Sequence, residues 1–197
     1  MIKKIKSVDL FSGCGGFSLG MERAGVEVVA AFDNWVKAQS VYEKNFKHPF
    51  ILEDLSNVEE VNKKLKEFDF NLIVGGPPCQ DFSSAGFRDE TRGRADLTID
   101  FLNIVISAKP RFFIMENVSR ILKSEKIEYL KSAFSENGYN LESVVLNASF
   151  FNVPQRRKRF FLVGSLEPFK TSFIDEIGKL KEVKEILQRF FRVRILL

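Results

Sequence analysis

Short apolar runs alternate with longer stretches of helical periodicity along the 197-residue chain, and this alternation constrains its fold more than any other feature. Such a pattern is typical of a parallel sheet whose strands are connected by crossover helices. We therefore expect an α/β fold, with a mostly parallel sheet of seven strands and helices on both of its faces. The predicted strands are residues 7–11, 27–32, 50–52, 71–74, 111–115, 141–146 and 159–163. The predicted helices are residues 17–24, 36–46, 57–68, 97–108 and 119–137.

The pattern changes after residue 169, where a charged helical stretch at residues 175–188 leads into a basic and apolar end. We expect residues 1–169 to form one globular domain and residues 170–197 to form a C-terminal helical tail. Two interpretations of the tail stay open: an ordinary helix that packs on the domain, and a truncated or out-of-frame end.

Composition limits the classes of protein to which the chain can belong. No apolar run approaches the roughly 20 residues of a membrane helix, and no signal-peptide pattern precedes the first strand, so we expect a cytoplasmic protein without a membrane partner. Two cysteines and one histidine are too few for a disulfide framework or a Cys/His zinc site, so we expect no metal. The net charge of +4, with four basic residues in a row at positions 156–159, permits a polyanionic partner.

The segment Asp9-Leu-Phe-Ser-Gly-Cys-Gly-Gly-Phe-Ser-Leu-Gly20 combines a strand, a glycine-rich turn and the start of a helix. It lets a ligand approach backbone N–H groups at a helix N-terminus. Asp33 ends the second predicted strand 17 positions after Gly16, near the spacing of about 20 residues at which a carboxylate meets a ribose hydroxyl. Together these features favour a nucleoside ligand, of the dinucleotide, nucleotide or S-adenosylmethionine type, over a plain tight turn. Asp54 follows the third predicted strand, where it can reach an adenine edge or cap a helix.

The segment Val74-Gly-Gly-Pro-Pro-Cys-Gln-Asp-Phe-Ser83 places a cysteine after two prolines at the carboxyl end of the fourth predicted strand. Open α/β sheets bind their ligands at this edge. The prolines stiffen the loop and fix the pose of Cys79, which suits a thiolate nucleophile. A buried and inert thiol is the usual alternative for a single cysteine, and the Gly-Gly-Pro-Pro setting argues against it.

Two further predicted strands have charged residues at their ends: Glu116 follows the fifth strand, and a basic run leads into the seventh. Glu116 lies at the carboxyl end of the fifth strand, where it can hold or donate a proton beside Cys79, or simply begin a surface helix. In Gln155-Arg-Arg-Lys-Arg159, strand alternation sends Arg157 and Arg159 to one face, where they can meet a base carbonyl and phosphates. A solvated charged face is the plainer interpretation of such a run.

The order, spacing and residue types of these segments resemble the motif series of the cytosine-C5 DNA methyltransferases. The matching segments are Asp9-Leu-Phe-Ser-Gly-Cys-Gly-Gly16, Gly76-Pro-Pro-Cys-Gln-Asp-Phe-Ser83, Glu116-Asn-Val118 and Gln155-x-Arg-x-Arg159, and residues 86–93 look like that family's mobile catalytic loop. The resemblance covers about residues 6–165. It implies the Rossmann-like fold of class I S-adenosylmethionine-dependent methyltransferases, with residues 1–169 as the cofactor-binding and catalytic domain.

The resemblance also implies transfer of a methyl group from S-adenosyl-L-methionine to carbon 5 of a cytosine flipped out of double-stranded DNA, as in restriction-modification systems. In that mechanism Cys79 attacks carbon 6 and Glu116 contacts the ring N3 and the exocyclic amine. Arg157 contacts the O2, and Arg159 lies near the cysteine loop. The implied cofactor-binding residues are Phe11, Ser12, Gly13, Gly15, Gly16, Asp33, Asn34, Asp54, Leu55 and Pro77.

The chain departs from the family pattern after the arginine-rich strand, because the target-recognition region and the closing motifs of the family are not visible. We expect a fold that lacks a target-recognition domain. Either a second chain supplies that region, or the chain is a truncated and inactive remnant. A cytosine in transfer RNA is the alternative substrate, although the Cys-Gln-Asp-Phe-Ser loop favours DNA. A nicotinamide-dependent oxidoreductase would explain only the glycine turn and Asp33, and a non-enzymatic DNA-binding module would explain only the basic run.

Overall fold

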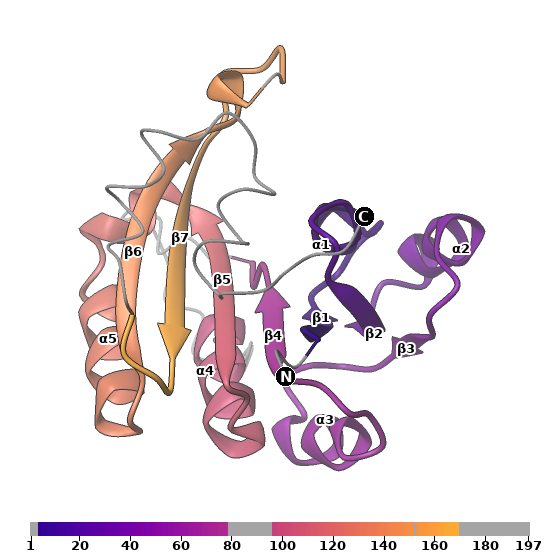
Figure 1. The fold of residues 1–197 in the computed structure, drawn as a ribbon, viewed down its shortest axis with the longest axis horizontal. Helices are drawn as coiled ribbons and strands as arrows, with labels where there is room; N and C mark the ends of the chain where they lie inside the picture. The colour runs from indigo at the N-terminus through magenta and orange to yellow at the C-terminus, as the bar shows by residue number, and fades with distance from the viewer. Residues whose placement is uncertain (1–3, 79–95, 152, 170–197) are drawn as a thin grey trace, which may run out of the picture.

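The computed structural model describes residues 4–78, 96–151 and 153–169, and Figure 1 shows the arrangement of their helices and strands. The strands are β1 (Lys6–Leu10), β2 (Glu27–Asp33), β3 (Phe50–Leu52), β4 (Leu72–Gly75), β5 (Phe112–Val118), β6 (Asn140–Asn147) and β7 (Lys158–Ser165). The helices are α1 (Gly16–Arg23), α2 (Val36–Asn45), α3 (Val58–Leu65), α4 (Leu97–Ala108) and α5 (Glu125–Glu136), together with the short 3-10 helices η1 (Ser119–Lys123) and η2 (Ala148–Phe150).

All seven strands belong to one sheet, in the order β3-β2-β1-β4-β5-β7-β6. The strands from β1 to β5 pair in parallel, whereas β7 lies antiparallel between β5 and β6. The strand order reverses at β1, because β2 and β4 pair with its two opposite edges. Open α/β sheets bind ligands outside the carboxyl ends of the strands at such a switch point. The topology therefore directs attention to the ends of β1, β2 and β4.

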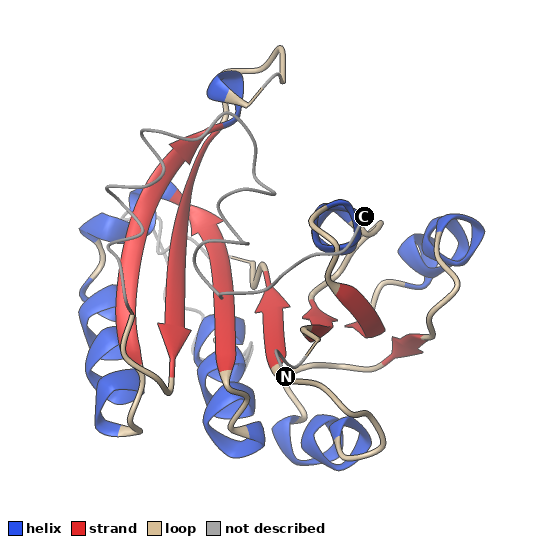
Figure 2. Cartoon of the chain, viewed as in Figure 1, coloured by secondary structure: helices blue, strands red, loops and turns tan. Residues whose placement is uncertain are grey.

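Helices cover both faces of the sheet (Figure 2). On one face, α3, α4 and α5 pack on strand residues such as Ile73 and Phe113. On the other face, α1 packs on Leu72 and Val74. Because alternate strand residues point to opposite faces and both faces are covered, the whole of β4 is buried. This is why the central strands read in the sequence as continuous apolar runs.

The predicted fold class is confirmed, and each predicted strand has its counterpart within a few residues. One helix prediction is wrong, because residues 119–137 form two elements, η1 and α5. Ser124 separates them: its backbone is extended, and its hydroxyl accepts the N–H of Lys126 at 3.2 Å as the N-cap of α5. Helical periodicity continues through such a cap, so the sequence alone shows no break. Gly138, with φ 89°, follows α5 as the predicted C-terminal glycine.

Several predictions lie outside the described residues. They include the nucleophile Cys79, the loop at residues 86–93 and the tail at residues 170–197. Within the described ranges, no helix combines the length and the apolar character needed to cross a membrane.

Candidate active site

The glycine turn, residues 11–16, leaves β1 and enters α1 through left-handed backbone. Phe11 has φ 57°, Gly13 has φ 51° and Gly15 has φ 93°. This conformation costs a residue with a side chain about 1–3 kcal/mol, and such strain clusters at ligand sites. Gly15 is required for close packing as well, because a Cβ at this position would lie 2.2 Å from Cε2 of Phe46. The turn is therefore strained at Phe11 and tightly packed at Gly15.

Asp33, the last residue of β2, holds the glycine turn from the side. Its Oδ2 accepts the N–H of Gly13 at 2.8 Å, and its Oδ1 accepts the N–H of Trp35 at 2.9 Å. A backbone hydrogen bond from Ser12 N–H to the carbonyl of Phe32, at 3.2 Å, adds a second link between the turn and β2. Each carboxylate oxygen has a further lone pair, so Asp33 can still accept a ligand hydroxyl.

A cavity of about 220 Å³ opens beside the turn, at the carboxyl ends of the strands. It is lined by Phe11, Asp33, Asn34, Asp54, Leu55, Gly76, Pro78 and Leu97. The first five are predicted cofactor-binding residues, and the fold brings them together from the ends of three strands. The last three were missed by sequence reasoning. Pro78 is next to the predicted Pro77, whereas Leu97 begins a helix and belongs to no motif, so nothing in the sequence marks it.

Asp54 is fixed beside the cavity by the chain that follows it. Its Oδ1 accepts the backbone N–H of Ser56 at 3.0 Å and the hydroxyl of Ser56 at 2.9 Å. The N-cap of α3 is Asn57, whose side chain accepts the N–H of Glu60, so the capping alternative does not apply to Asp54. Its carboxylate is therefore free of a capping role and can accept a hydrogen bond from an amine in the cavity.

The chemistry of the cavity fits the nucleoside part of S-adenosylmethionine. Phe11, Leu55 and Leu97 give apolar walls against which a flat ring can pack. Asp33 and Asp54 add two carboxylates, which can accept hydrogen bonds from the hydroxyl or amine groups of a ligand. Apolar walls with a few convergent polar groups are the usual composition of a small-molecule site.

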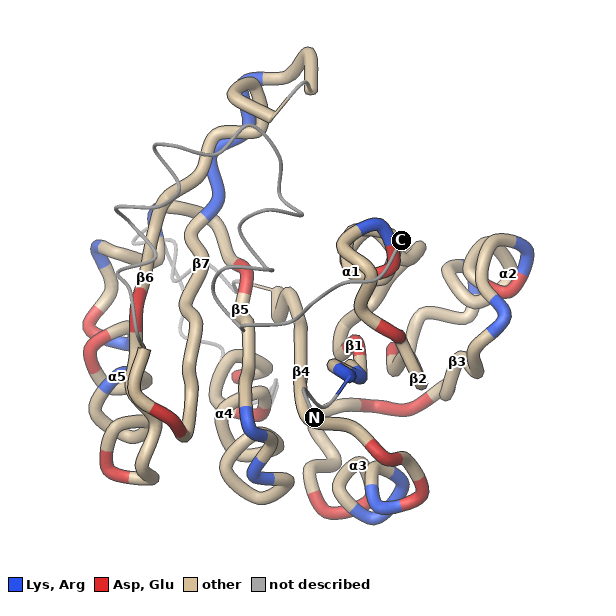
Figure 3. The backbone as a smooth tube through the Cα atoms, viewed as in Figure 1, with Lys and Arg blue, Asp and Glu red and all other residues tan. Residues whose placement is uncertain are grey.

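Glu116 and Arg159 meet across β5 and β7. The register pairs Val118 with Arg159, so Glu116, two residues earlier on β5, is a diagonal neighbour on the same face. Arg159 Nε lies 2.8 Å from Glu116 Oε1, and the two side chains are 23% and 25% exposed. Figure 3 shows basic residues at the start of β7 beside an acidic position near the end of β5. One arginine of the basic run is thus mostly buried against a carboxylate.

Burial raises the pKa of Glu116 above its ordinary value, while the positive charges of Arg159 and Arg157 act in the opposite direction. Burial prevails, so the carboxyl keeps its proton more readily than an exposed glutamate does. Such a group is suited to hold or donate a proton. Arg159 touches the carboxylate, whereas Arg157 is exposed and acts on it through its charge.

The segment that leads to Cys79 is anchored at the end of β5. Asn117 is 2% exposed, and its Nδ2 donates to the carbonyl of Pro77 at 3.1 Å. Gly76 lies beside Glu116, since a Cβ at Gly76 would be 3.3 Å from Glu116 Oε2. Cys79 lies outside the described residues, but the chain just before it is next to both the Glu116 carboxyl and the cavity. In the sequence Asn117 stands only within the Glu116-Asn-Val118 segment, and nothing there indicates this anchoring contact.

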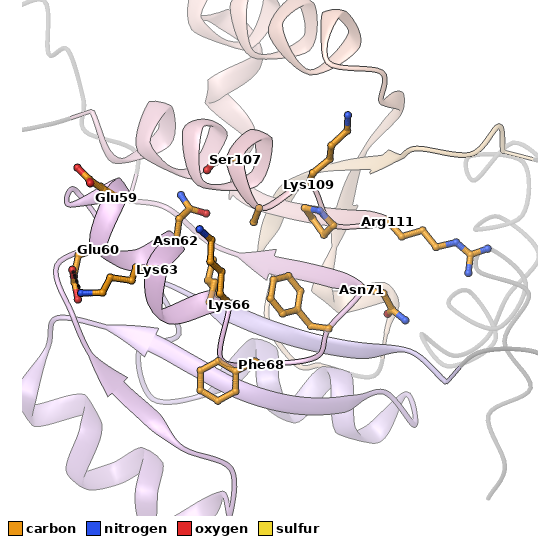
Figure 4. Close-up of a pocket in the computed structure, with 14 residues that line it drawn as sticks. Glu59, Glu60, Asn62, Lys63, Lys66, Phe68, Asn71, Ser107, Lys109 and Arg111 are labelled. Carbon is orange, nitrogen blue, oxygen red and sulfur yellow. Dashed lines mark ion pairs between the residues drawn. The ribbon is translucent and has the colours of Figure 1, made fainter.

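A larger groove, of about 860 Å³, lies at the opposite edge of the sheet. It is formed by α3, by the end of α4 and by the segments that lead into β4 and β5, and Figure 4 shows Lys63, Lys66 and Lys109 around it. None of the predicted site residues lines it. Because α/β sheets bind ligands at the carboxyl ends of their strands, its volume alone does not make it the candidate active site. Within the part of the chain that is described, no cluster of three His, Cys, Asp or Glu side chains could hold a metal ion.

Comparison with known proteins gives one consistent family. The family model described as C-5 cytosine-specific DNA methylase matches residues 5–191. Type II methyltransferase M.HindV of Haemophilus influenzae is 54% identical over 162 residues, which cover 82% of this chain and 53% of that protein. Type II methyltransferase M.HgiDI of Herpetosiphon aurantiacus is 50% identical over 160 residues, which cover 81% and 52%. The chain spans about half the length of these curated relatives.

Solved structures agree on the fold. The Dnmt2 methyltransferase of S. pombe superimposes with a TM-score of 0.77 at 25% sequence identity, over 91% of this chain and 56% of that one. DNMT2 of Spodoptera frugiperda superimposes with a TM-score of 0.70 at 24% identity, over 82% and 50%. The expected class I methyltransferase fold is therefore confirmed.

Proposed function

Because the chain belongs to the C-5 cytosine-specific DNA methylase family, we propose that it transfers a methyl group from S-adenosyl-L-methionine to carbon 5 of cytosine in DNA. The observation that carries the proposal is the contact between Glu116 and Arg159 beside the Gly76-Pro-Pro segment that leads to Cys79. This pair lies at the same edge of the sheet as the cavity that Asp33 lines. A proton-holding group, a nucleophile and a nucleoside pocket are the three parts that the reaction needs.

The cavity is the proposed cofactor site. S-adenosylmethionine supplies an electrophilic methyl group when it is bound. Phe11 and Leu55 would pack against its adenine ring. Asp33 would accept hydrogen bonds from its ribose hydroxyls, and Asp54 would accept one from its adenine amine. The other proposed cofactor-binding residues are Ser12, Gly13, Gly15, Gly16, Asn34 and Pro77.

Cys79 is the proposed nucleophile, because carbon 5 of cytosine is too weak a nucleophile to be methylated directly. The thiolate adds to carbon 6 of a base flipped into the site, and the electron pair of the ring double bond moves to carbon 5. Carbon 5 would take the methyl group, with the electron pair of the broken methyl–sulfur bond left on the departing S-adenosylhomocysteine, and would then lose its proton to water. The electrons of that C–H bond restore the double bond and expel the thiolate, so Cys79 leaves the cycle unchanged.

Glu116 is proposed to contact the ring N3 and the exocyclic amine of the flipped cytosine. Negative charge grows on the ring when the thiolate adds, and a carboxyl with a raised pKa can donate a proton to N3 at that moment. Arg157 is proposed to contact the O2 of the base, and Arg159 to orient Glu116 and support the cysteine loop. The 2.8 Å contact of Arg159 with Glu116 supports this division of roles.

Double-stranded DNA is the proposed substrate, and residues 156–158, which are basic and exposed, can contact its phosphates. Base-sequence readout is proposed to come from a second chain that carries the target-recognition region. M.HindV extends beyond the part that this chain matches, which is 53% of its length. On this proposal the chain alone binds S-adenosylmethionine weakly or not at all.

Transfer of a labelled methyl group tests the function. The purified 197-residue chain is incubated with labelled S-adenosylmethionine and mixed-sequence duplex DNA, with and without the part of M.HindV that it does not match. We expect label in 5-methylcytosine, and only with the added polypeptide. Incorporation by the chain alone would support the activity and overturn the need for a second chain. Label in transfer RNA but not in DNA would overturn the proposed substrate, and no label under any condition would contradict the activity.

A mechanism-based trap tests the nucleophile. A cytosine with fluorine at carbon 5 has no proton to lose, so the adduct with the thiolate stays intact after methyl transfer. The chain has only two cysteines, and Cys14→Ser is therefore the matched control for Cys79→Ser. With S-adenosylmethionine and the added polypeptide present, we expect a protein–DNA adduct by mass spectrometry with the unmodified chain and with Cys14→Ser. An equal amount of adduct with Cys79→Ser would remove Cys79 from the mechanism.

A further inference from the structure

A buried chain of hydrogen bonds runs from the glycine turn toward the surface and has no part in the mechanism above. Asp9 is 0% exposed, and its Oδ2 accepts the N–H of Ser18 at 2.9 Å and lies 2.6 Å from Ser18 Oγ. Ser18 Oγ lies 2.6 Å from the hydroxyl of Tyr42, which lies 2.6 Å from Nε2 of His48. Nδ1 of His48 lies 3.5 Å from Glu22. The chain connects β1, α1, α2 and the loop before β3.

The two hydroxyls fix the direction of these hydrogen bonds. Each hydroxyl has one proton, so all the bonds must run the same way. In one arrangement, Nε2–H of His48 donates to Tyr42, Tyr42 donates to Ser18, and Ser18 donates to an ionised Asp9. In the other arrangement, a protonated Asp9 donates to Ser18, Ser18 donates to Tyr42, and Tyr42 donates to a bare Nε2. The protonation of Asp9 therefore decides which ring nitrogen of His48 carries a proton.

The surroundings favour the second arrangement between the pH at which the imidazolium loses its proton and about pH 7. Burial raises the pKa of Asp9 to about 7, and the charge of Asp33 acts in the same direction, against the two hydrogen bonds from the α1 backbone and side chain. Burial lowers the pKa of His48, and Glu22 acts in the opposite direction. Burial also raises the pKa of Tyr42, so its hydroxyl keeps its proton. An ionised carboxylate with a charged imidazole is thus less favourable here than the neutral pair.

Asp9 also takes the place of the missing cap of α1. The N-cap residue Gly15 has no side chain to cap the helix, and Asp9 accepts the N–H of Ser18, the third helical residue. The glycine turn is therefore held by two carboxylates, Asp33 at Gly13 and Asp9 at Ser18. A charged acceptor makes a shorter and stronger hydrogen bond than a neutral one. The protonation of Asp9 thus changes how firmly one end of the turn is held.

We infer that Asp9 and His48 share a proton-transfer chain through Ser18 and Tyr42, and that this chain positions the glycine turn for the cofactor. When Asp9 ionises, its proton moves to Ser18 Oγ, the Ser18 proton to Tyr42 and the Tyr42 proton to Nε2. The proton on Nδ1 leaves on the side of Glu22. The positioning role rests on the proposed function, whereas the coupling of Asp9 to His48 does not. Asp9 is a positioning residue, because it acts on the turn through Ser18.

Nuclear magnetic resonance of the imidazole tests the coupling. His48 is the only histidine of the chain, so ¹⁵N-labelled histidine gives one pair of ring signals. For the unmodified chain we expect two steps as the pH rises. The imidazolium first loses a proton below the ordinary pKa of histidine, and near pH 7, where Asp9 ionises, the ring then changes from the Nδ1–H to the Nε2–H form.

Three variants interrupt the series of hydrogen bonds, at Asp9, at Ser18 or at Tyr42. Ser18→Ala, Tyr42→Phe and Asp9→Asn should each abolish the second step, although Ser18 and Asp9 do not touch His48. Ser40→Ala, an exposed serine on α2, is the matched control and should keep both steps. Two steps in Ser18→Ala, or a single step in the unmodified chain, would overturn the coupling. If one variant does not fold, the narrow dispersion of its amide proton signals shows this. The other two variants then test the coupling.

Calorimetry of S-adenosylmethionine binding between pH 6 and pH 8, with the complementing polypeptide present, tests the positioning role. We expect the dissociation constant of the unmodified chain to change by about threefold or more across this range, and that of Tyr42→Phe to change less. Equal pH dependence in the two proteins would overturn the positioning role while the coupling stands. No binding by either protein at any pH would contradict the proposed function and leave the coupling of Asp9 to His48 intact.

Discussion

Arg159 and Glu116 face each other across β7 and β5, with the guanidinium Nε 2.8 Å from the carboxylate Oε1. Their contact follows from the antiparallel register, which places Arg159 opposite Val118 and therefore diagonal to Glu116. Two opposing effects therefore set the pKa of the Glu116 carboxyl: burial raises it, and the arginine from the neighbouring strand lowers it. This balance can be changed by single substitutions.

Arg159→Gln should raise the pKa of Glu116 further, because it removes the charge that opposes the effect of burial. A carboxyl whose pKa is raised stays protonated to a higher pH. We expect the limb of the pH–rate profile of methyl transfer that reports Glu116 to move to higher pH. We also expect the maximum rate to fall by about tenfold or more, because the carboxyl loses the group that orients it.

Arg157→Gln is the matched control, since it removes the same charge from an exposed residue that acts on Glu116 only through its charge. Its effect on the pH limb should have the same sign and be smaller. An equal or larger movement with Arg157→Gln would contradict the assignment of Arg159 as the residue that tunes Glu116.

Gly15→Ala should destabilise the fold. The residue has φ 93°, and the new Cβ would lie 2.2 Å from Phe46 Cε2. Left-handed backbone costs a residue with a side chain about 1–2 kcal/mol, and overpacking adds about 1–3 kcal/mol. We expect the free energy of unfolding in urea to fall by about 2–5 kcal/mol. Gly20→Ala, inside the helix that Gly15 precedes and with open space around it, should raise the free energy of unfolding by up to about 1 kcal/mol. Similar losses in both variants would point to a general effect of helix substitution.

Asn117→Ala should leave the carbonyl of Pro77 buried without its donor. We expect the free energy of unfolding to fall by about 1–3 kcal/mol, the cost of an unsatisfied buried polar group. The rate of methyl transfer should fall more than the affinity for S-adenosylmethionine, because Asn117 anchors the segment before Cys79 and does not line the cavity. Asn45→Ala, an exposed asparagine that bonds the carbonyl of Val41 in its own helix, should change neither quantity appreciably. A loss of affinity without a loss of rate in Asn117→Ala would place Asn117 in the cofactor site.

Asp9→Asn should change how stability depends on pH. The pKa of Asp9 is about 7 in the fold and near 3.8 in the unfolded chain, so the folded state binds one proton more between these values. The contribution of Asp9 to stability is fully present below pH 3.8 and is lost as the pH rises through 7. Relative to Asp9→Asn, the unmodified chain should lose up to about 1.4 kcal/mol per pH unit across this interval. Parallel stability curves from chemical unfolding at several pH values would show that Asp9 is ionised in the fold throughout.

The amino-acid sequence by itself determined the class of the fold and the edge of the sheet at which the candidate site lies. Apolar runs, helical periodicity and the glycines and prolines between them are local properties, since each depends on neighbours along the chain. They predicted every strand that the structure describes, and they predicted that Phe11, Asp33 and Asp54 lie at or just after strand ends. The same local character explains the error at Ser124, where a helix cap interrupts a periodicity that continues on both sides.

Only the tertiary structure decided which of these residues meet. Because β7 lies between β5 and β6, Arg159 pairs beside β5 and contacts Glu116. Arg157 precedes β7 and stays exposed. The two arginines look alike in the sequence. The hydrogen bonds from Asp9 to His48 likewise join four elements whose spacing along the chain has no pattern. Strand order and register are set by the burial of whole faces against one another, which is a property of the complete core, and no local stretch of the chain contains it.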